Sequence, residues 1–365
     1  MTDPYRAAGV DYDVLDAAKR LAMGAARATS GQLEQHGGRA ADESRGEPAF
    51  VFSLGEESFA FVLECLGTKS LLARQHQEAT GEDHFRAIGI DSVAAIVNDL
   101  CCVGALPLVV AAYFATGHPD WYADEGRFAS LVEGWRAACE ESGATWGGGE
   151  SPSLPGLVSE RDVEIAGSSV GRIPAGIEPI LGQRLAPGDE IVLIASTGLH
   201  ANGASLVRKL GAELPDGLRT ELPSGATLGA AALRASAVYA PVVAALVRAS
   251  LPVTYLSHVT GHGLRKLMRP DRELTYRISA LPPVPELFTF MAEALGMSDY
   301  DSYGTFNMGA GYAVYCAAGA GEDAVSVARD CGFEALVAGV VEEGPRRVVV
   351  EPLGVTYSTE ALSLR

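Results

Sequence analysis

One stretch, residues 89–117 (GIDSVAAIVNDLCCVGALPLVVAAYFATG), constrains the fold more than any other part of the chain. Apolar residues at helical spacing predict a helix over residues 88–103. Pro107 ends any helix, and the apolar, partly β-branched run at residues 108–115 predicts a fully buried strand. The helix and the strand are therefore expected to lie beside each other in one core.

The same helix carries three polar residues on one edge. Asp91, Asn98 and Asp99 stand at positions i, i+7 and i+8, which a period of 3.6 residues places on the same side. A carboxylate beside a core strand is costly unless a cation accompanies it. Spacing alone leaves two alternatives open: both aspartates are solvated, or a cationic group lies next to them.

Composition bounds the class of protein. A chain of 365 residues with 48% hydrophobic and 20% charged residues is long enough for two globular domains. The formal net charge of −18 argues against nucleic acid and against an anionic membrane surface as partners. Phosphorylated substrates are not excluded, because backbone N–H groups, a few cations and bound metal can hold them.

Cysteine usage and the apolar segments indicate a cytoplasmic protein. None of the six cysteines forms a CxxC pair, and most stand in apolar context, so buried free thiols are expected. The acidic N-terminus lacks the apolar core of a signal peptide. The longest apolar region, residues 100–115, is shorter than the roughly 20 residues that a membrane-spanning helix needs.

Alternating strand and helix patterns predict an α/β (α+β) fold with two domains. A Pro- and Gly-containing segment at residues 173–187 suggests the boundary, so we expect domains at residues 1–175 and 176–365. In the first domain, residues 30–48 are expected to be a loop and residues 65–70 a small-residue turn that presents Lys69. In the second, helices are expected at 204–210, 228–250, 285–295 and 323–331, and strands at 189–195, 252–256, 273–278, 312–317, 335–341 and 347–350.

Glycine turns recur after predicted strands: CLGTK at 65–69, GGGE at 147–150, STGLHANG at 196–203 and HVTGHG at 258–263. Glycines let a backbone approach a ligand and direct N–H groups at phosphate oxygens, so four such turns favour an anionic ligand. His200 and His258 lie in two of these turns. Each is either a structural residue or a catalytic one, and the sequence leaves both alternatives open. A set of carboxylates suits Mg²⁺: Glu64, Asp91, Asp99 and Glu150.

Longer motifs make a specific resemblance. In order, they are YRAAGVD at 5–11, GTK at 67–69, GIDSVAAIVNDL at 89–100, YFATG at 113–117, GGE at 148–150, HANGASLVRK at 200–209, HVTGHG at 258–263 and TFNMGAG at 305–311. They span nearly the whole chain. The chain resembles the aminoimidazole ribonucleotide synthetase family, also called phosphoribosylformylglycinamidine cyclo-ligase, of purine biosynthesis.

The resemblance implies a fold, cofactors and a reaction. The N-terminal domain would bind ATP and Mg²⁺ and pair through its sheet in a homodimer, and a C-terminal mixed α/β domain would close the active site. A small phosphoribosyl substrate, formylglycinamidine ribonucleotide, would be phosphorylated on its formamide oxygen and cyclised. Such chemistry needs charge neutralisation and positioning more than covalent help.

The resemblance also implies roles for individual residues. Catalytic roles would fall to His200, His258 and Lys69. The nucleotide would contact Thr68, Lys69, Asp91, Asn98, Asp99, Gly148 and Gly149. The substrate would contact His200, Asn202, Gly203, Ser205 and Thr260, and metal would be held by Glu64, Asp91, Asp99 and Glu150.

The chain departs from the family pattern at several of these places. Glu64-Cys65-Leu66 replaces the family's aspartate-glycine-valine, Ser153 replaces a glutamate, and His262 stands inside a turn that is all glycine in the family. Residues 37–47 are charged where the family has a loop rich in glycine and phenylalanine. Two alternatives therefore stand beside the cyclo-ligase: a diverged paralogue that phosphorylates another substrate, and a non-catalytic nucleotide-binding dimer.

Overall fold

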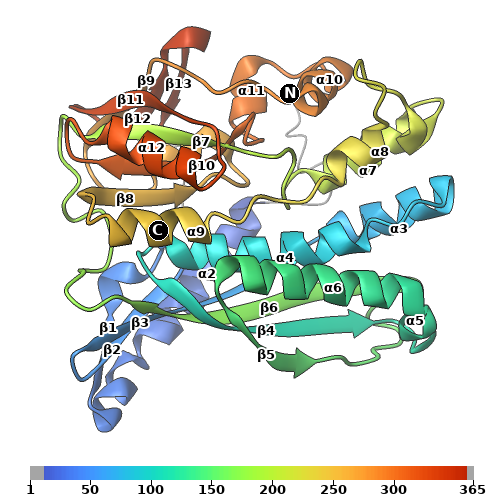
Figure 1. Cartoon of the computed structure of the whole chain (residues 1–365), viewed down its shortest axis with the longest axis horizontal. Helices are drawn as coiled ribbons and strands as arrows, with labels where there is room; N and C mark the ends of the chain where they lie inside the picture. The colour runs from blue at the N-terminus through green and yellow to red at the C-terminus, as the bar shows by residue number, and fades with distance from the viewer. Residues whose placement is uncertain (1–11, 360–365) are drawn as a thin grey trace.

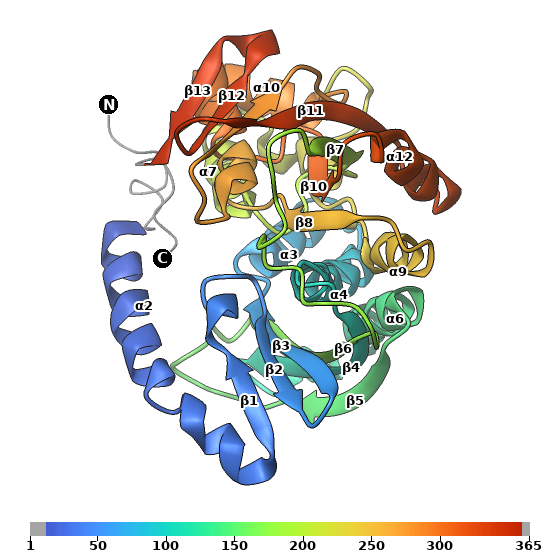
Figure 2. The same cartoon turned by 90° about the vertical axis from the view of Figure 1, so that its left-hand side faces the viewer.

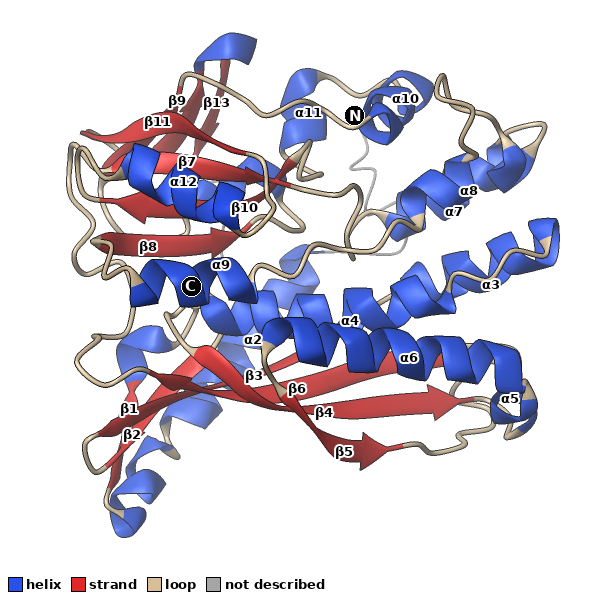
Figure 3. Ribbon diagram, viewed as in Figure 1, coloured by secondary structure: helices blue, strands red, loops and turns tan. Residues whose placement is uncertain are grey.

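The computed structural model describes residues 12–359, which form two domains, each built on its own β-sheet (Figure 1). This confirms the predicted α/β architecture. The YRAAGVD segment at 5–11 and the last residues, 360–365, lie outside the described residues. Long helices of the first domain lie between the two sheets, so the domains meet across a helical layer (Figure 3).

The first sheet has the strand order β1-β2-β3-β6-β4-β5 within the described part of the chain. Neighbouring strands are antiparallel except for the parallel pair β4 and β5. The strands are β1 (Gly38–Ala41), β2 (Phe50–Leu54), β3 (Glu57–Cys65), β4 (Leu106–Thr116), β5 (Thr145–Glu150) and β6 (Val163–Ile173). The helices are α2 (Tyr12–Arg27), α3 (Lys69–Thr80), α4 (Phe85–Cys101), α5 (Asp120–Ala123) and α6 (Glu125–Ser142).

The predicted central helix and strand are confirmed as α4 and β4. Helices α4 and α6 lie side by side on one face of the sheet (Figures 1 and 2). Two glycines permit this close packing, because a Cβ at Gly89 would overlap the backbone carbonyl of Leu131, and one at Gly134 would overlap that of Arg86. Gly89 and Gly134 therefore allow the two helices to pack closely.

The opposite face of this sheet carries exposed apolar side chains. Phe61 on β3 and Val109 on β4 both pair with Val170 on β6, so their side chains share a face. Phe61 is 42% exposed, Val109 42% and Leu63, two residues along β3, 69%. Met23 of helix α2 lines one hollow together with Phe61 and Leu63, so this helix borders the patch without burying it. Contiguous apolar patches of this kind are typical of interaction surfaces.

The second sheet has the order β13-β12-β9-β11-β7-β10-β8 among the described residues. Its strands are β7 (Glu190–Ala195), β8 (Val253–His258), β9 (Leu274–Ile278), β10 (Ala310–Cys316), β11 (Ala335–Glu343), β12 (Arg347–Val350) and β13 (Val355–Ser358). Its helices are α7 (Ala204–Glu213), α8 (Leu228–Ala232), α9 (Ala240–Arg248), α10 (Glu286–Leu295), α11 (Asp299–Tyr303) and α12 (Gly321–Asp330). Strands β7, β8 and β10 are almost wholly buried, which suits their apolar sequences.

Three predicted segments differ from the structure. The loop at 30–48 contains two 3₁₀ helices, η1 (Ser30–His36) and η2 (Asp42–Ser44), with strand β1 between them. The turn at 65–70 ends early, because helix α3 begins at Lys69. The helix predicted over 228–250 is two helices, α8 and α9, separated by the irregular segment 233–239.

The cysteines and the apolar helices bear on the remaining expectations from the sequence. All six cysteines are free thiols, and four are buried as expected, but Cys65 is exposed and Cys331 is partly exposed. The prediction of burial is wrong at these two positions, because Cys65 ends strand β3 at the rim of a cavity and Cys331 follows the last residue of helix α12. Among the described residues, no helix is both long enough and apolar enough to cross a membrane.

Candidate active site

A cavity of about 580 Å³ lies between the two domains. Its walls come from the end of β3, from helix α4, and from the loops that follow β7 and β8. Most residues predicted from the sequence line it: Glu64, Thr68, Asp91, Asn98, Asp99, His200, Asn202, Gly203, Ser205, His258 and Thr260. The glycine turns and the polar edge of α4 therefore face one space.

Three predicted residues lie elsewhere. Gly148, Gly149 and Glu150 belong to β5, the edge strand of the first sheet, and are exposed. They do not line the cavity between the domains. Within one chain, these residues are separate from the group that surrounds the cavity.

Lys69 and Asp91 form a fully buried ion pair beside the cavity. Lys69 Nζ lies 2.7 Å from Asp91 Oδ2, and both side chains are 0% exposed. Burial raises the pKa of Asp91, and the Lys69 charge and the Ser236 hydrogen bonds oppose that shift. Burial lowers the pKa of Lys69, and Asp91 opposes that shift. Of the two alternatives left open for Asp91, the cationic neighbour is the one observed, and it is a lysine.

The polar edge of α4 also holds the irregular segment 233–239 of the second domain. Asp91 Oδ1 accepts hydrogen bonds from Ser236 N at 2.8 Å and Ser236 Oγ at 2.5 Å. Asn98 donates to Ala237 O at 2.9 Å and accepts from Tyr239 N at 2.7 Å. These side chains satisfy backbone groups that a helix would otherwise pair internally. This explains why the predicted helix over 228–250 is interrupted.

Asp99, the third polar residue of α4, pairs with a histidine from the second domain. His258 Nδ1, at the end of β8, lies 2.6 Å from Asp99 Oδ1. Burial would raise the pKa of Asp99, but the His258 hydrogen bond and charge outweigh it and the pKa is lowered. A carboxylate on Nδ1 orients the ring and leaves Nε2 as the nitrogen that can accept a proton.

Glu64 is held close to the Asp99 carboxylate. Burial first, and the Asp99 charge second, raise the pKa of Glu64 to about 8. A hydrogen bond between the two carboxyl groups contributes to the same shift. Near neutral pH the pair therefore shares a proton, as two adjacent carboxyl groups do when only one can ionise.

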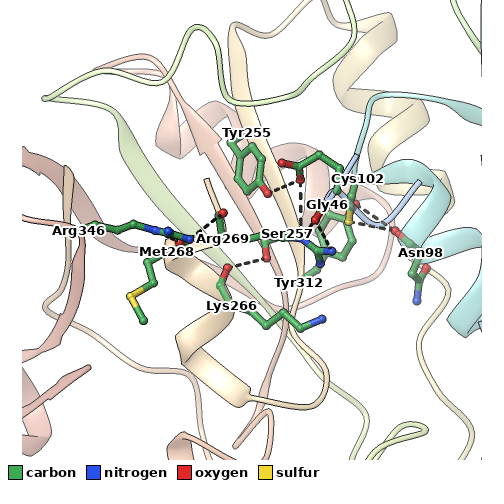
Figure 4. A network of polar contacts seen from close by, with 11 residues as sticks. Gly46, Asn98, Cys102, Tyr255, Ser257, Lys266, Met268, Arg269, Tyr312 and Arg346 are labelled. Carbon is green, nitrogen blue, oxygen red and sulfur yellow. Dashed lines mark hydrogen bonds and ion pairs between the residues drawn. The ribbon is translucent and has the colours of Figure 1, made fainter. Parts of the chain in front are cut away.

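Sequence reasoning did not identify the basic end of this cavity. Lys266, on the 3₁₀ helix η4 (Gly263–Met268), and Arg269 line it together with Glu47. Figure 4 shows Arg269 bound to Gly46 O, at 3.0 and 2.9 Å, while the Lys266 ammonium extends away from that network. The Tyr255 hydroxyl donates a hydrogen bond to Glu47 Oε2 at 2.7 Å, which holds the Glu47 carboxylate in place.

Lys266 is 9% exposed, and its Nζ makes no hydrogen bond or ion pair with any described residue. Burial and the nearby Arg269 charge lower its pKa, while Asp99 and Glu64 oppose that shift. A buried, unpaired ammonium in a cavity is suited to hold an anionic group. The signal for Lys266 and Arg269 in the sequence was a basic stretch after the HVTGHG turn.

Two histidines of the cavity adopt left-handed backbone conformations. His200 has φ 58° and His262 has φ 73°, in a region that residues other than glycine rarely adopt. His200 Nε2 accepts from Thr197 N at 3.3 Å. Burial lowers the pKa of His200 well below its usual value, and the charges of His258 and Lys69 add to this. His200 is therefore neutral at physiological pH.

The first turn of α7, which follows the loop after β7, also contacts the first domain directly. Thr68 Oγ1 and Ser205 Oγ are 2.8 Å apart across the domain boundary. Gly203, in the same loop, has φ 106°, and a Cβ there would overlap Leu199 and Phe306. The substrate contacts implied for Asn202, Gly203 and Ser205 thus fall on the end of this loop and the first turn of α7, and Ser205 connects that turn to the start of α3.

The carboxylates differ in their capacity to hold a metal ion. Both oxygens of Asp91 are engaged, one by Lys69 and the other by Ser236, so its donor set does not fit Mg²⁺ in this conformation. Glu64 and Asp99 offer adjacent oxygens, and a cation would take the place of the proton that they share. Mg²⁺ is commonly held by one or two carboxylates together with phosphate oxygens, so this pair fits.

Comparison with known proteins agrees with the arrangement of the two domains. The family model described as AIR synthase related protein, N-terminal domain, matches residues 46–173, and its C-terminal counterpart matches residues 186–351. Curated relatives named phosphoribosylformylglycinamidine cyclo-ligase include one from Alkaliphilus oremlandii, 32% identical over 95% of this chain and 99% of the relative. Another, from Anaeromyxobacter sp., is 34% identical over 96% of this chain and 99% of the relative.

Solved structures share the fold at lower identity. Hydrogenase maturation protein HypE in complex with ATP has a TM-score of 0.59 and 20% identity, covering 82% of this chain and 83% of its own. AaThiL complexed with AMPPCP and TMP has a TM-score of 0.57 and 16% identity, covering 86% of this chain and 90% of its own. Since two domain models cover most of the chain and ligase relatives match nearly all of it, the chain belongs to the AIR synthase family, as its motifs predicted.

Proposed function

We propose that this protein is an ATP-dependent cyclo-ligase that converts formylglycinamidine ribonucleotide into aminoimidazole ribonucleotide. The observation that carries the proposal is the Asp99–His258 contact beside Glu64 in a cavity between two domains of this family. The curated relatives bear the name of this ligase. Neighbours of the same fold bind ATP or AMPPCP, which supports a nucleotide in this cavity.

Glu64 and Asp99 would hold Mg²⁺, and Thr68 would contact the nucleotide phosphates. When bound, ATP supplies the γ-phosphoryl group and Mg²⁺ neutralises its charge. Glu64 must first give up the proton that it shares with Asp99. In one chain, Gly148, Gly149 and Glu150 are not part of this proposed site, because β5 lies outside the cavity.

In the proposed reaction, the formamide oxygen of the substrate takes the γ-phosphoryl group. A nitrogen of the same substrate then attacks the activated carbon, loses a proton, and phosphate leaves as the ring closes. His258 is the proposed base, because Asp99 holds its Nδ1 and leaves Nε2 to take the proton. His200 is less suited to this step, because burial keeps its pKa low, and we propose that it positions the substrate.

Lys266 and Arg269 would attract the phosphate of the ribonucleotide. Both line the cavity, and Lys266 has no anionic partner within ion-pair distance among the described residues. Lys69, by contrast, would act through its pair with Asp91, which fixes the segment 233–239 at the cavity wall. These assignments divide the three cations into two that bind the phosphate, Lys266 and Arg269, and one, Lys69, that organises the cavity wall.

A homodimer is part of the proposal. The open face of the first sheet presents Phe61, Leu63 and Val109, which a second copy of the sheet could cover. Such pairing would remove apolar surface from water without closing the cavity, which helix α4 lines on the other side of the sheet. We also propose that the enzyme works in the cytoplasm, where its substrate class and free thiols belong.

The test is a turnover assay with purified protein, ATP, Mg²⁺ and formylglycinamidine ribonucleotide. We expect phosphate and aminoimidazole ribonucleotide to form in equal amounts. His258→Gln should abolish most turnover, whereas the matched surface variant His118→Gln, at an exposed residue outside the cavity, should not. ATP binding without ring formation would contradict the proposal.

One specific observation favours a second reaction within the same family. His262 and Lys266 place a bulky imidazole and an ammonium in the cavity, which suits a substrate with more negative charge. A diverged kinase would release ADP with another phosphorylated compound and remain silent with the purine substrate. A panel of phosphorylated acceptors, assayed for ADP release, distinguishes the two reactions.

A further inference from the structure

A cluster of metal-ligating side chains lies outside the cavity, at the junction of α3 and α4. His76 comes from the last turns of α3, and Glu82 and His84 come from the short connection to α4. One ligand atom from each residue lies within 4.8 Å of the other two. Neither the family motifs nor the proposed reaction uses these residues.

The distances resemble those of a tetrahedral metal site. His76 Nε2 lies 3.2 Å from Glu82 Oε2, and His84 Nε2 lies 3.5 Å from the same oxygen. In a tetrahedral Zn²⁺ site with bonds of about 2.0–2.1 Å, neighbouring ligand atoms are roughly 3.3 Å apart. Two of the three edges therefore already have the required length. The imidazole rings lie with centroids 4.9 Å apart and are inclined at 59°, so they do not stack face to face.

The buried ligand is held rigidly. The His76 side chain is 0% exposed, and its Nδ1 has no hydrogen-bond partner in the described chain. A Cβ on Gly229 of α8 would overlap Nδ1, so the second domain packs directly against this ring. The His84 Nε2 atom is also buried without a hydrogen-bond partner among the described residues. Two imidazole nitrogens thus lack the partners that buried polar atoms normally have.

The protonation states suit metal binding. Burial lowers the pKa of His76, which keeps its ring neutral. The His76 hydrogen bond and the nearby His84 ring lower the pKa of Glu82, which keeps it ionised. A neutral imidazole and a carboxylate are the forms that ligate metal. Glu82 is 62% exposed, so an ion can reach the cluster from solvent and keep a water as its fourth ligand.

We propose that His76, Glu82 and His84 form a binding site for a zinc-class divalent ion. Two imidazoles and one carboxylate favour Zn²⁺, Co²⁺ or Ni²⁺ over Mg²⁺, which prefers oxygen ligands. The ion would connect the end of α3 to the start of α4. These helices carry Lys69 and Asp91 at positions facing the other domain, so the ion would brace the two elements that form the buried pair.

The test uses Co²⁺ as a spectroscopic probe and Zn²⁺ as a calorimetric one, with the full chain. We expect one Co²⁺ per chain with the visible absorption of a four-coordinate site, displaced by Zn²⁺ but not by a hundredfold excess of Mg²⁺. Glu82→Gln and His84→Ala change residues of a connecting segment, not of a helix, and each should weaken Zn²⁺ binding at least tenfold. His118→Ala, which removes an exposed histidine beside Asp120, is the matched control and should bind as the unmodified chain does.

A second measurement separates loss of the site from loss of the fold. Zn²⁺ should raise the thermal midpoint of the unmodified chain and of His118→Ala, and leave that of folded Glu82→Gln unchanged. Zn²⁺ binding of equal strength in Glu82→Gln and His84→Ala would overturn the proposal, as would the absence of any Co²⁺ band in the unmodified chain. Neither result depends on the reaction that the cavity catalyses.

Discussion

Replacing Glu64 by glutamine should change how the stability of the protein depends on pH. Burial and the Asp99 charge raise the pKa of Glu64 from 4.5 to about 8. A carboxyl group whose pKa is raised on folding stabilises the protein fully below its unfolded pKa, and this contribution is lost as pH rises through the folded pKa. Glutamine resembles the protonated form at every pH and can still donate to Asp99.

The magnitude follows from the size of the shift. A shift from 4.5 to about 8 corresponds to at most roughly 5 kcal/mol at about 1.36 kcal/mol per unit, and partial exposure reduces this to about 3–5 kcal/mol. The free energy of unfolding of Glu64→Gln should therefore be close to that of the unmodified chain at pH 4.5. It should exceed it by about 3–5 kcal/mol at pH 9.

Urea denaturation at several pH values, followed by intrinsic fluorescence, measures this difference. Glu56→Gln, at an exposed residue of the turn before the same strand, is the matched control for the change from carboxylate to amide. If the difference between Glu64→Gln and the unmodified chain changes by less than about 1 kcal/mol from pH 4.5 to 9, Glu64 and Asp99 do not share a proton as described.

Four further predictions concern the ion pair, the basic residue, the helix contact and the open sheet face. Lys69→Met should cost about 3–5 kcal/mol in urea denaturation, because it strands buried Asp91, and a cost below about 1 kcal/mol would show that the pair is not closed. Lys266→Met should raise the KM for the phosphorylated substrate about tenfold or more with a smaller effect on kcat, and an unchanged KM in steady-state assays would remove its role in binding. Gly134→Ala should lower the thermal midpoint, because its Cβ overlaps the Arg86 carbonyl and would cost about 1–3 kcal/mol, whereas a neutral effect would mean that α4 and α6 pack less closely. Leu63→Asp should convert a dimer to a monomer in light scattering, and an unchanged mass would place any interface elsewhere.

The sequence predicted most of the elements near the cavity. Helix α4 and strand β4 were predictable from the spacing of their apolar residues and from Pro107 between them. Burial against the core imposes that spacing on both elements. The interruption at 233–239 was not predictable in this way. The side chains that bind its backbone, Asp91 and Asn98, lie more than a hundred residues away in sequence. The local apolar pattern also continues through the segment without a break.

The same limit applies to the site. Motifs identified Asp99 and His258 separately, but their contact, at 2.6 Å, depends on how two domains meet. In the sequence, Lys266 simply follows a glycine turn. Only the fold shows that its side chain lines the cavity. Asp91 was predicted to bind metal as one of four carboxylates and from the family resemblance, while its position beside a core strand required only a cation nearby. The structure supplies that cation as Lys69, from a helix that local sequence predicted as a turn.

The proposed reaction is tested most directly by following one oxygen atom. In a single turnover with substrate labelled with ¹⁸O at the formamide oxygen, phosphorylation of that oxygen followed by ring closure transfers the label to inorganic phosphate. We predict one labelled oxygen in each phosphate released, together with one molecule of aminoimidazole ribonucleotide. Unlabelled phosphate, or ADP formed without the imidazole, would contradict the proposed cyclo-ligase mechanism.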